Sequence, residues 1–273
     1  MRVMDLTDKV SVVTGGAQGL GRSFVEILLK NGAKVAILDV NESLGNELKV
    51  TLNKQYGSDR TEFYTTDVTS EEQFKGVFQK IVDKFGRIDI LCNNAGIINE
   101  NNWEKCIAVN LGGVVKGTYL ALEHMKKDKG GNGGVIVNVA SMAGLGPLPS
   151  APMYTATKHS VVGFTRAMSM VSTFSNYGVR INALCPGFVN TSLLTLFSSE
   201  EHVGRFIHLK NVSEKLLEQY GFIETDDVAK AFLALVKDET KNGEVMMVNV
   251  DGAAYVSFPK QVKDIPFTKV DLQ

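Results

Sequence analysis

Short runs of consecutive apolar residues alternate along the chain with longer segments in which apolar residues recur every three or four positions. The short runs, bounded by turn-forming residues, predict buried strands, and the longer segments predict amphipathic helices. The expected strands are residues 10–14, 34–39, 62–66, 88–92, 135–140, 179–185 and 245–248. The expected helices are residues 19–31, 42–55, 71–85, 103–127, 154–174 and 226–236. Glycines at 112, 113 and 117 weaken the helix over 103–127.

Strands that are apolar along their whole length, and that alternate with helices, indicate a parallel sheet covered on both faces. We therefore expect an α/β fold with a single Rossmann-type, doubly wound parallel sheet of about seven strands and helices on both faces. Residues 192–222 break the alternation, because they are helix-prone with scattered apolar positions. They are expected to form an insertion over the carboxyl ends of the strands, where such sheets bind ligands.

Composition narrows the class of protein further. A formal net charge of −1, with scattered Lys and Arg, argues against a nucleic-acid surface. We find no uninterrupted apolar run long enough to span a bilayer, and the charged first residues do not resemble a signal peptide. Cys92, Cys106 and Cys185 show no pairing pattern, and no His stands at metal-ligand spacing from them. We expect buried, reduced thiols, no metal site and a cytoplasmic location.

The first apolar run leads directly into a cluster of glycines, "TGGAQGLG", over residues 14–21. Glycines between a strand and a helix let the backbone turn tightly and approach a pyrophosphate, which the unpaired N–H groups of the helix N-terminus bind. Its place after the first strand of an alternating chain favours a dinucleotide site over a plain turn. The cofactor contacts expected there are Gly15, Gln18, Gly19, Leu20 and Gly21.

Asp39 ends the second expected strand, about twenty residues beyond the glycine cluster. An acid at this position accepts hydrogen bonds from a ribose 2′-hydroxyl and repels the 2′-phosphate of NADP. The next residue is Val40 rather than Arg, and Gln18 rather than a cation precedes Gly19. NAD is therefore the expected cofactor, with Asp39 and Val40 among its contacts.

A Ser, a Tyr and a Lys lie between residues 138 and 164. Tyr154 and Lys158 stand four positions apart on an expected helix, so both side chains face the same way. The ammonium is expected to stabilise the phenolate and to lower its pKa from about 10, so that Tyr154 exchanges a proton with an alcohol. Ser141 ends an expected strand, and its hydroxyl is expected to hydrogen-bond the substrate oxygen. Tyr and Lys at this spacing also fit a partly buried aromatic beside a surface lysine.

Together these segments resemble the short-chain dehydrogenase/reductase family over nearly the whole chain. The matching motifs are "TGGAQGLG", Asp67-Val68, Asn93-Asn94-Ala95-Gly96, Asn110, Ser141, Tyr154-x-x-x-Lys158 and Pro186-Gly187. The resemblance implies that residues 1–273 form one dinucleotide-binding catalytic domain, with 192–222 covering the substrate. It also implies a homodimer, in which the helices over 103–127 and 154–174 pair with their copies. The small residues expected to allow this close approach are Gly112, Gly113, Gly117, Ala121 and Ala167.

The same resemblance implies roles for individual residues. Asn110 is expected to hold a water that links Lys158 to solvent, which completes a catalytic set with Ser141 and Tyr154. Lys158 is also expected to hold the nicotinamide ribose. Further cofactor contacts implied by the family are Asp67, Val68, Asn94, Ala95, Gly96, Tyr154, Lys158, Val189 and Thr191.

Three longer stretches, "FGRIDILCNNAGIINENNWEKCIAVN", "GGNGGVIVNVASMAGLGP" and "VRINALCPGFVNTSLL", are similar to the 15-hydroxyprostaglandin dehydrogenase branch of this family. The stretch "VNLGG" is also similar to insect alcohol and photoreceptor dehydrogenases. The prostaglandin branch carries a Gln that hydrogen-bonds the substrate hydroxyl at the position of Ala151, which cannot do so. The expected substrate contacts are Ser141, Ala151, Tyr154, Phe188 and Tyr220.

The expected function is NAD-dependent oxidation of a secondary alcohol on a small apolar substrate. Two alternatives stay open at this point. One is a steroid, retinoid or isoprenoid alcohol dehydrogenase, or a carbonyl reductase, of the same family. The other is a catalytically silent NAD-binding protein, and the intact Ser, Tyr, Lys and Asn argue against it.

Overall fold

Eight strands pair into one sheet in the part of the chain that the computed structural model describes, residues 3–259, 262–266 and 268. Their order across the sheet is β3-β2-β1-β4-β5-β6-β7-β8, and the first seven in the sequence run parallel. The doubly wound α/β prediction is confirmed, with one strand more than expected. The strands are β1 (Val10–Thr14), β2 (Lys34–Asp39), β3 (Thr61–Thr65), β4 (Ile90–Asn93), β5 (Gly134–Val139), β6 (Val179–Pro186), β7 (Val245–Asn249) and β8 (Gly252–Tyr255).

The strand that the sequence did not reveal is β8, which pairs antiparallel with β7 at the sheet edge. It follows a two-residue turn, and all four of its residues are exposed. Its sequence, "GAAY", carries no β-branched residue and no alternation of apolar and polar positions. Backbone hydrogen bonds to β7 hold this strand, so its side chains carry no sequence pattern that would predict it.

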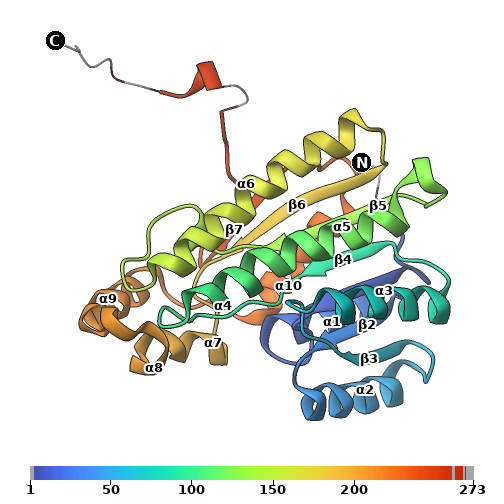
Figure 1. Cartoon of the computed structure of the whole chain (residues 1–273), viewed down its shortest axis with the longest axis horizontal. Coiled ribbons are helices and arrows are strands. Elements are labelled where there is room, and N and C mark those ends of the chain that lie inside the picture. Colours follow the sequence, from blue (N-terminus) through green and yellow to red (C-terminus); the bar gives the residue numbers. More distant parts are fainter. Residues whose placement is uncertain (1–2, 260–261, 267, 269–273) are drawn as a thin grey trace.

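Helices cover both faces of the sheet (Figure 1). On one face the core includes Phe24 and Phe232, whose ring centroids lie 4.5 Å apart, and on the other it includes Phe74 and Phe78. The helices on the first face are α1 (Gly19–Lys30), α2 (Glu42–Tyr56) and α10 (Thr225–Lys237), and those on the second are α3 (Glu71–Phe85), α5 (Val114–Met125) and α6 (Pro152–Phe174). Two hydrophobic layers thus fix the sheet and bring the carboxyl ends of its parallel strands to one edge.

The expected helix over 103–127 is not continuous. It begins as α4 (Trp103–Ile107), widens into a π-helical stretch at Ala108–Gly113, and resumes as α5, which ends at Met125. Two adjacent glycines close the π-helical stretch, which fits their weak helix propensity. Every other expected element agrees with the structure to within two residues at each boundary.

Between β6 and α10 lies a chain of short helices, α7 (Ser192–Thr195), α8 (Glu200–Val203) and α9 (Lys210–Tyr220), with 3₁₀ turns between them. We call residues 192–220 the helical insert. Figure 1 shows its three helices grouped together at one end of the molecule. No helix in the described ranges is both long and apolar enough to cross a membrane.

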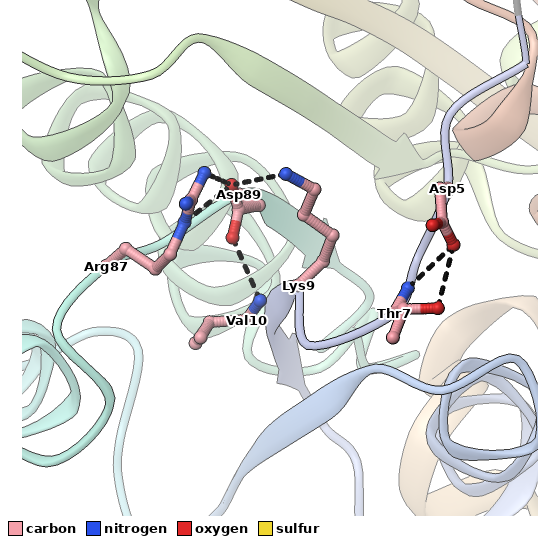
Figure 2. Close-up of polar contacts among 6 residues, drawn as sticks. All are labelled: Asp5, Thr7, Lys9, Val10, Arg87 and Asp89. Carbon is pink, nitrogen blue, oxygen red and sulfur yellow. Dashed lines mark hydrogen bonds and ion pairs between the residues drawn. The ribbon is translucent and has the colours of Figure 1, made fainter.

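At the opposite edge of the sheet, ion pairs and hydrogen bonds of one carboxylate join the amino ends of two strands. Asp89 precedes β4 and is buried; its carboxylate accepts the N–H of Val10 at 3.0 Å and pairs with Arg87 and, at 3.9 Å, with Lys9 (Figure 2). In the same view, Asp5 accepts the N–H and hydroxyl of Thr7. The bonds of Asp89 to Val10 and Lys9 tie the amino ends of β1 and β4 together.

Candidate active site

A cavity of about 800 Å³ runs along the carboxyl ends of the strands, from the glycine loop after β1 to the helical insert. The segments after β2, β3, β4, β5, β6 and β7 and the start of α6 supply much of the rest of its wall. The sequence-predicted residues that line it are Gly15, Gln18, Gly19, Leu20, Gly21, Asp39, Val40, Asp67, Val68, Asn94, Ala95, Gly96, Ser141, Tyr154, Lys158, Phe188, Val189, Thr191 and Tyr220. Residues from eight separated parts of the chain therefore meet around one space.

The glycine loop needs its glycines for two different reasons. Gly15 and Gly19 have positive φ angles of 61° and 55°, which residues with a side chain rarely adopt. Gly21 has no room for a side chain, because a Cβ there would lie 2.0 Å from the carbonyl oxygen of Gly15. The loop is therefore held in one tight turn at the N-terminus of α1, with its backbone toward the cavity.

Asn94 joins the loop after β4 to the glycine loop. Its side-chain amide donates to the carbonyls of Thr14 and Gly15, each at 3.0 Å. The Thr14 hydroxyl in turn accepts the backbone N–H groups of Asn94 and Ala95, also at 3.0 Å. These bonds cross the gap between β1 and β4, the point at which the strand order reverses.

Asp39 is buried at the end of β2 and lines the cavity. One carboxylate oxygen accepts the N–H of Ala17 in the glycine loop at 3.0 Å, and the other accepts the N–H of Asn41 at the same distance. The carboxylate thus supports the loop as well as facing the cavity beside the exposed Val40.

Asn110 lies within the π-helical stretch and is fully buried. Its amide oxygen accepts the N–H of Ile97 at 2.8 Å, and its amide nitrogen donates to the Ile97 carbonyl at 2.9 Å and to Thr157 Oγ1 at 3.2 Å. It does not line the cavity. Its side chain instead fixes the loop after β4 against the helix that carries Lys158.

Tyr154 and Lys158 lie together on α6, and both are buried. The Lys158 Nζ donates to the Val139 carbonyl at 2.9 Å and lies 5.5 Å from the centroid of the Tyr154 ring. Ser141 Oγ accepts the N–H of Ala143 at 3.1 Å, which holds its hydroxyl at the end of β5. The helix spacing places Tyr154 and Lys158 side by side, and the end of β5 brings Ser141 to the same cavity.

The protonation of this pair differs from the expectation. Burial raises the pKa of the Tyr154 phenol to about 12, and the Ser141 hydroxyl opposes that rise. Burial also lowers the pKa of the Lys158 ammonium to about 8. Burial of the phenol thus acts against the lowering of its pKa that the sequence analysis expected.

The end of the cavity beside Tyr154 is apolar. The helical insert contributes Leu193, Leu194, Leu196, Phe197 and Leu216 to its wall. The Phe197 ring meets Tyr154 edge-on, with centroids 5.9 Å apart. Ala151 is fully buried beneath this wall, against Ile98 and Leu148, and is not among the lining residues.

Comparisons with known proteins agree with this geometry. The family model described as short chain dehydrogenase matches residues 9–202. The chain belongs to the short-chain dehydrogenase family. It is 44% identical over 245 residues to 15-hydroxyprostaglandin dehydrogenase (NAD(+)) of Homo sapiens, covering 90% of this chain and 92% of the relative. It is 32% identical over 259 residues to 3beta-hydroxysteroid dehydrogenase 2 of Eggerthella lenta, covering 92% and 96%. The crystal structure of levodione reductase is 28% identical, with a TM-score of 0.77 over 89% of this chain and 97% of that one.

Two residues of this short-chain dehydrogenase support the site in ways that the sequence analysis did not predict. Thr14 was read as the end of a strand, although its hydroxyl supports the loop after β4. Glu100 was not singled out, although it is buried and its carboxylate accepts the N–H groups of Met153 and Tyr154. Thr14 belongs to the glycine-cluster motif and Glu100 to no motif, and the role of each depends on contacts with residues distant in sequence.

The three cysteines of this short-chain dehydrogenase are buried and unpaired. Among the residues that the structure describes, no three His, Cys, Asp or Glu side chains are arranged to hold a metal ion. Burial raises the pKa of each thiol, which makes the thiols weak nucleophiles.

Proposed function

We propose that this protein is an NAD-dependent dehydrogenase that oxidises a secondary alcohol on an apolar, lipid-like substrate. One observation carries the proposal: a single cavity joins the glycine loop and Asp39 at one end to Ser141, Tyr154 and Lys158 near the other. A dinucleotide that lies along the loop with its ribose at Asp39 extends toward Tyr154. The chemistry that NAD supplies when bound is acceptance of a hydride from the alcohol carbon.

The residues around the glycine loop fit a dinucleotide. The loop turns its backbone toward the cavity at the N-terminus of α1, where unpaired N–H groups favour a pyrophosphate. Asp39 presents a carboxylate to the same cavity, which suits two ribose hydroxyls and disfavours a 2′-phosphate. Asp67 and Val68 would bind the adenine, and Val189 and Thr191 the nicotinamide end.

Tyr154 is the proposed acid and base. In alcohol oxidation it accepts the hydroxyl proton, so the reactive form is the phenolate, and Ser141 donates a hydrogen bond to the substrate oxygen. Because burial raises the phenol pKa to about 12, the phenolate fraction and kcat/KM for oxidation should rise with pH above neutrality. Lys158 supplies the nearby positive charge, and Asn110 holds the loop and helix between which a proton path would run.

The substrate follows from the lining of the cavity. Six side chains of the helical insert, Tyr220 among them, and Phe188 after β6 would contact a hydrocarbon skeleton above Tyr154. Each buried methylene adds roughly 0.8 kcal/mol of binding, so a prostaglandin or steroid alcohol should be preferred over a short aliphatic one. The names of two similar proteins, a 15-hydroxyprostaglandin and a 3beta-hydroxysteroid dehydrogenase, likewise favour a lipid-like alcohol over a short one.

We further propose a homodimer through α6. The exposed positions of α6 carry no Asp, Glu, Lys or Arg. Two large apolar side chains on this helix, Met170 and Phe174, are 56% and 79% exposed. Of the small residues expected at this contact, Gly113, Gly117 and Ala121 instead face the core; a Cβ on Gly117 would lie 2.2 Å from Asn93 Oδ1. Ala167 is on the exposed face. Light scattering at micromolar concentration should give the dimer mass, and Phe174→Arg should give the monomer.

The test of the dehydrogenase is Tyr154→Phe. This change keeps the ring and its packing against Phe197 and removes only the hydroxyl, so NADH binding should persist. Turnover of NAD with a panel of prostaglandin, steroid and short aliphatic alcohols, followed by NADH absorbance, should fall by about 10²–10⁴-fold.

Tyr119→Phe is the matched control, because Tyr119 is half-exposed on α5 and lies outside the cavity. It should leave turnover unchanged. A Tyr154→Phe enzyme within about tenfold of the parent would contradict the assignment. A parent enzyme that reduces no NAD with any alcohol of the panel would contradict the proposed function itself.

A further inference from the structure

Helix α6 carries Tyr154 in its first turn, yet its own sequence does not cap it. The N-cap residue is Ala151, which has no side-chain acceptor, and Pro152 follows at the first helical position. The backbone N–H groups of the next two residues, Met153 and Tyr154, therefore need an acceptor from elsewhere. In most helices a Ser, Thr, Asp or Asn at the N-cap supplies it.

Glu100 supplies this acceptor from more than fifty residues away. Its Oε2 accepts the N–H of Met153 at 3.0 Å, and its Oε1 accepts the N–H of Tyr154 at 2.9 Å. The residue is 6% exposed, and a buried carboxylate is costly unless such bonds compensate it. The negative charge also lies at the positive end of the α6 dipole, which stabilises this arrangement.

The same short segment holds the helical insert. The backbone N–H of Glu100 donates to the His202 carbonyl at 2.6 Å. The Asn101 amide donates to the carbonyls of Glu200 and Glu201, and a Cβ on Gly204 would lie 1.9 Å from Asn101 Oδ1. One segment thus contacts α6 on one side and α8 on the other.

We propose that Glu100 is a positioning residue for Tyr154: it fixes the first turn of α6, and so the phenol, in register with the insert that lines the substrate end. The inference rests on the proposed function, since it assigns Tyr154 the proton transfer. It assigns no contact between Glu100 and the reacting atoms. Glu100 is not among the residues that line the cavity.

The test is Glu100→Gln, which keeps the shape of the side chain. An amide has one oxygen, so one of the two backbone N–H groups faces an NH₂ donor and loses its acceptor. We expect kcat per NADH-binding site to fall by about tenfold, because small displacements of a reacting group cost this much. KM for NAD and the affinity for NADH should stay within about twofold, because the glycine loop is held by Asn94 and Asp39 instead.

Hydrogen exchange of peptides over 148–158 gives a readout without turnover. The amides of Met153 and Tyr154 should exchange about tenfold faster in Glu100→Gln than in the parent. Glu104→Gln removes the same charge from an exposed side chain on α4 and should change neither kcat nor this exchange. If Glu100→Gln does not fold, Glu100→Asp keeps both oxygens and should show a smaller loss confined to kcat.

Several outcomes overturn the inference. Unchanged exchange would remove the capping role, and faster exchange with unchanged kcat would remove the positioning role. Equal losses of kcat and NADH affinity would mean that Glu100 merely stabilises the fold. If the parent oxidises no alcohol but shows the predicted exchange difference, the proposed function fails while the capping by Glu100 stands.

Discussion

The two ends of the cavity are built by different means. At the glycine-loop end, hydrogen bonds among backbone and short side chains join β1, β2 and β4, through Thr14, Asn94 and Asp39. At the other end, the helical insert presents apolar side chains, and a Ser150–Ser213 hydroxyl pair and the Asn101 amide are among its polar ties to the body. Most residues of the insert are exposed or half-buried, whereas the glycine loop is packed on the sheet.

This difference separates the reaction from the choice of substrate. At the cofactor end, replacing Thr14, Asn94 or Asp39 leaves a hydrogen-bonding group of the glycine loop or of the loop after β4 without its partner, at about 1–3 kcal/mol each. At the substrate end a side chain can change size while the sheet below keeps its bonds. The cofactor should therefore resist alteration, and the substrate range should be adjustable by substitutions in the insert.

The largest expected effect is that of Gly21→Ala. The new Cβ would lie 2.0 Å from the Gly15 carbonyl oxygen and 2.7 Å from the Asn94 amide nitrogen, so the glycine loop must shift. NADH affinity, measured by fluorescence titration, should weaken by about 100-fold, or ~2.8 kcal/mol.

Gly76→Ala is the matched control for Gly21→Ala. A Cβ on Gly76 of α3 would meet nothing within 4 Å, so this change should leave NADH binding intact and stabilise the helix slightly. Equal effects of the two substitutions would mean that the cofactor end is no more tightly constrained than an ordinary helix.

The next effect concerns Lys158, which lies where the two ends meet. Its pKa is about 8 in the fold and 10.5 in the unfolded chain, so the buried ammonium destabilises the fold most below pH 8. The penalty fades as pH rises toward 10.5, because the unfolded state then binds more protons than the folded one. Relative to Lys158→Met, the parent should gain about 2 kcal/mol of unfolding free energy between about pH 7 and about pH 9.5.

Urea unfolding of both proteins across this range measures that gain. Lys30→Met, at an exposed position of α1, should follow the parent at every pH. If the unfolding free energies of the parent and of Lys158→Met change with pH in parallel, the pKa of Lys158 is not lowered in the folded protein.

A smaller effect is expected from substitutions that change the cofactor preference from NAD to NADP. Asp39→Ala combined with Val40→Arg removes a carboxylate and adds a guanidinium where a 2′-phosphate would lie, so kcat/KM should shift toward NADP by about tenfold or more. Val40→Arg alone separates the gained cation from the lost carboxylate. Preference for NADP in the parent enzyme would refute the reading of Asp39.

The smallest effect should come from the insert itself. Leu196→Ala opens the cavity wall, so KM for a steroid or prostaglandin alcohol should rise about threefold with little change in the unfolding free energy. Leu28→Ala makes the same change in the fully buried core of α1 and should cost about 2–5 kcal/mol. A comparable loss of stability from Leu196→Ala would erase the distinction between the two ends.

Much of the fold was predictable because its signals are local. Apolar runs and helical periodicity marked seven strands and most helices to within two residues, and the glycine cluster marked the cofactor end. The strand β8 was missed because its side chains are exposed, and the π-helical stretch because periodicity assumes a regular helix.

The site residues could be predicted only where their spacing in the sequence fixes their positions in space. Tyr154 and Lys158 are one helical turn apart, so their meeting is fixed by α6 itself. The contacts of Glu100 with α6 and of Thr14 with the loop after β4 depend on how distant segments pack, and no local pattern encodes that. The pKa of Tyr154 likewise depends on burial, which the Tyr and Lys pair does not reveal.

The π-helical stretch at Ala108–Gly113 also sets a phase along the chain. A π-turn acts as one residue inserted into an α-helix, so the residues after it are rotated by about 100° relative to an unbroken helix. Asn110, inside the stretch, accepts the N–H of Ile97, and Gly117, after it, lies against Asn93. Deleting one residue from the stretch would remove the bulge and leave α4 and α5 facing as they do now, whereas deleting one within α5 would rotate every later residue of the helix by about 100°. The π-helical stretch is therefore the point at which the length of this helix can change by one residue while α4 and α5 keep their buried faces.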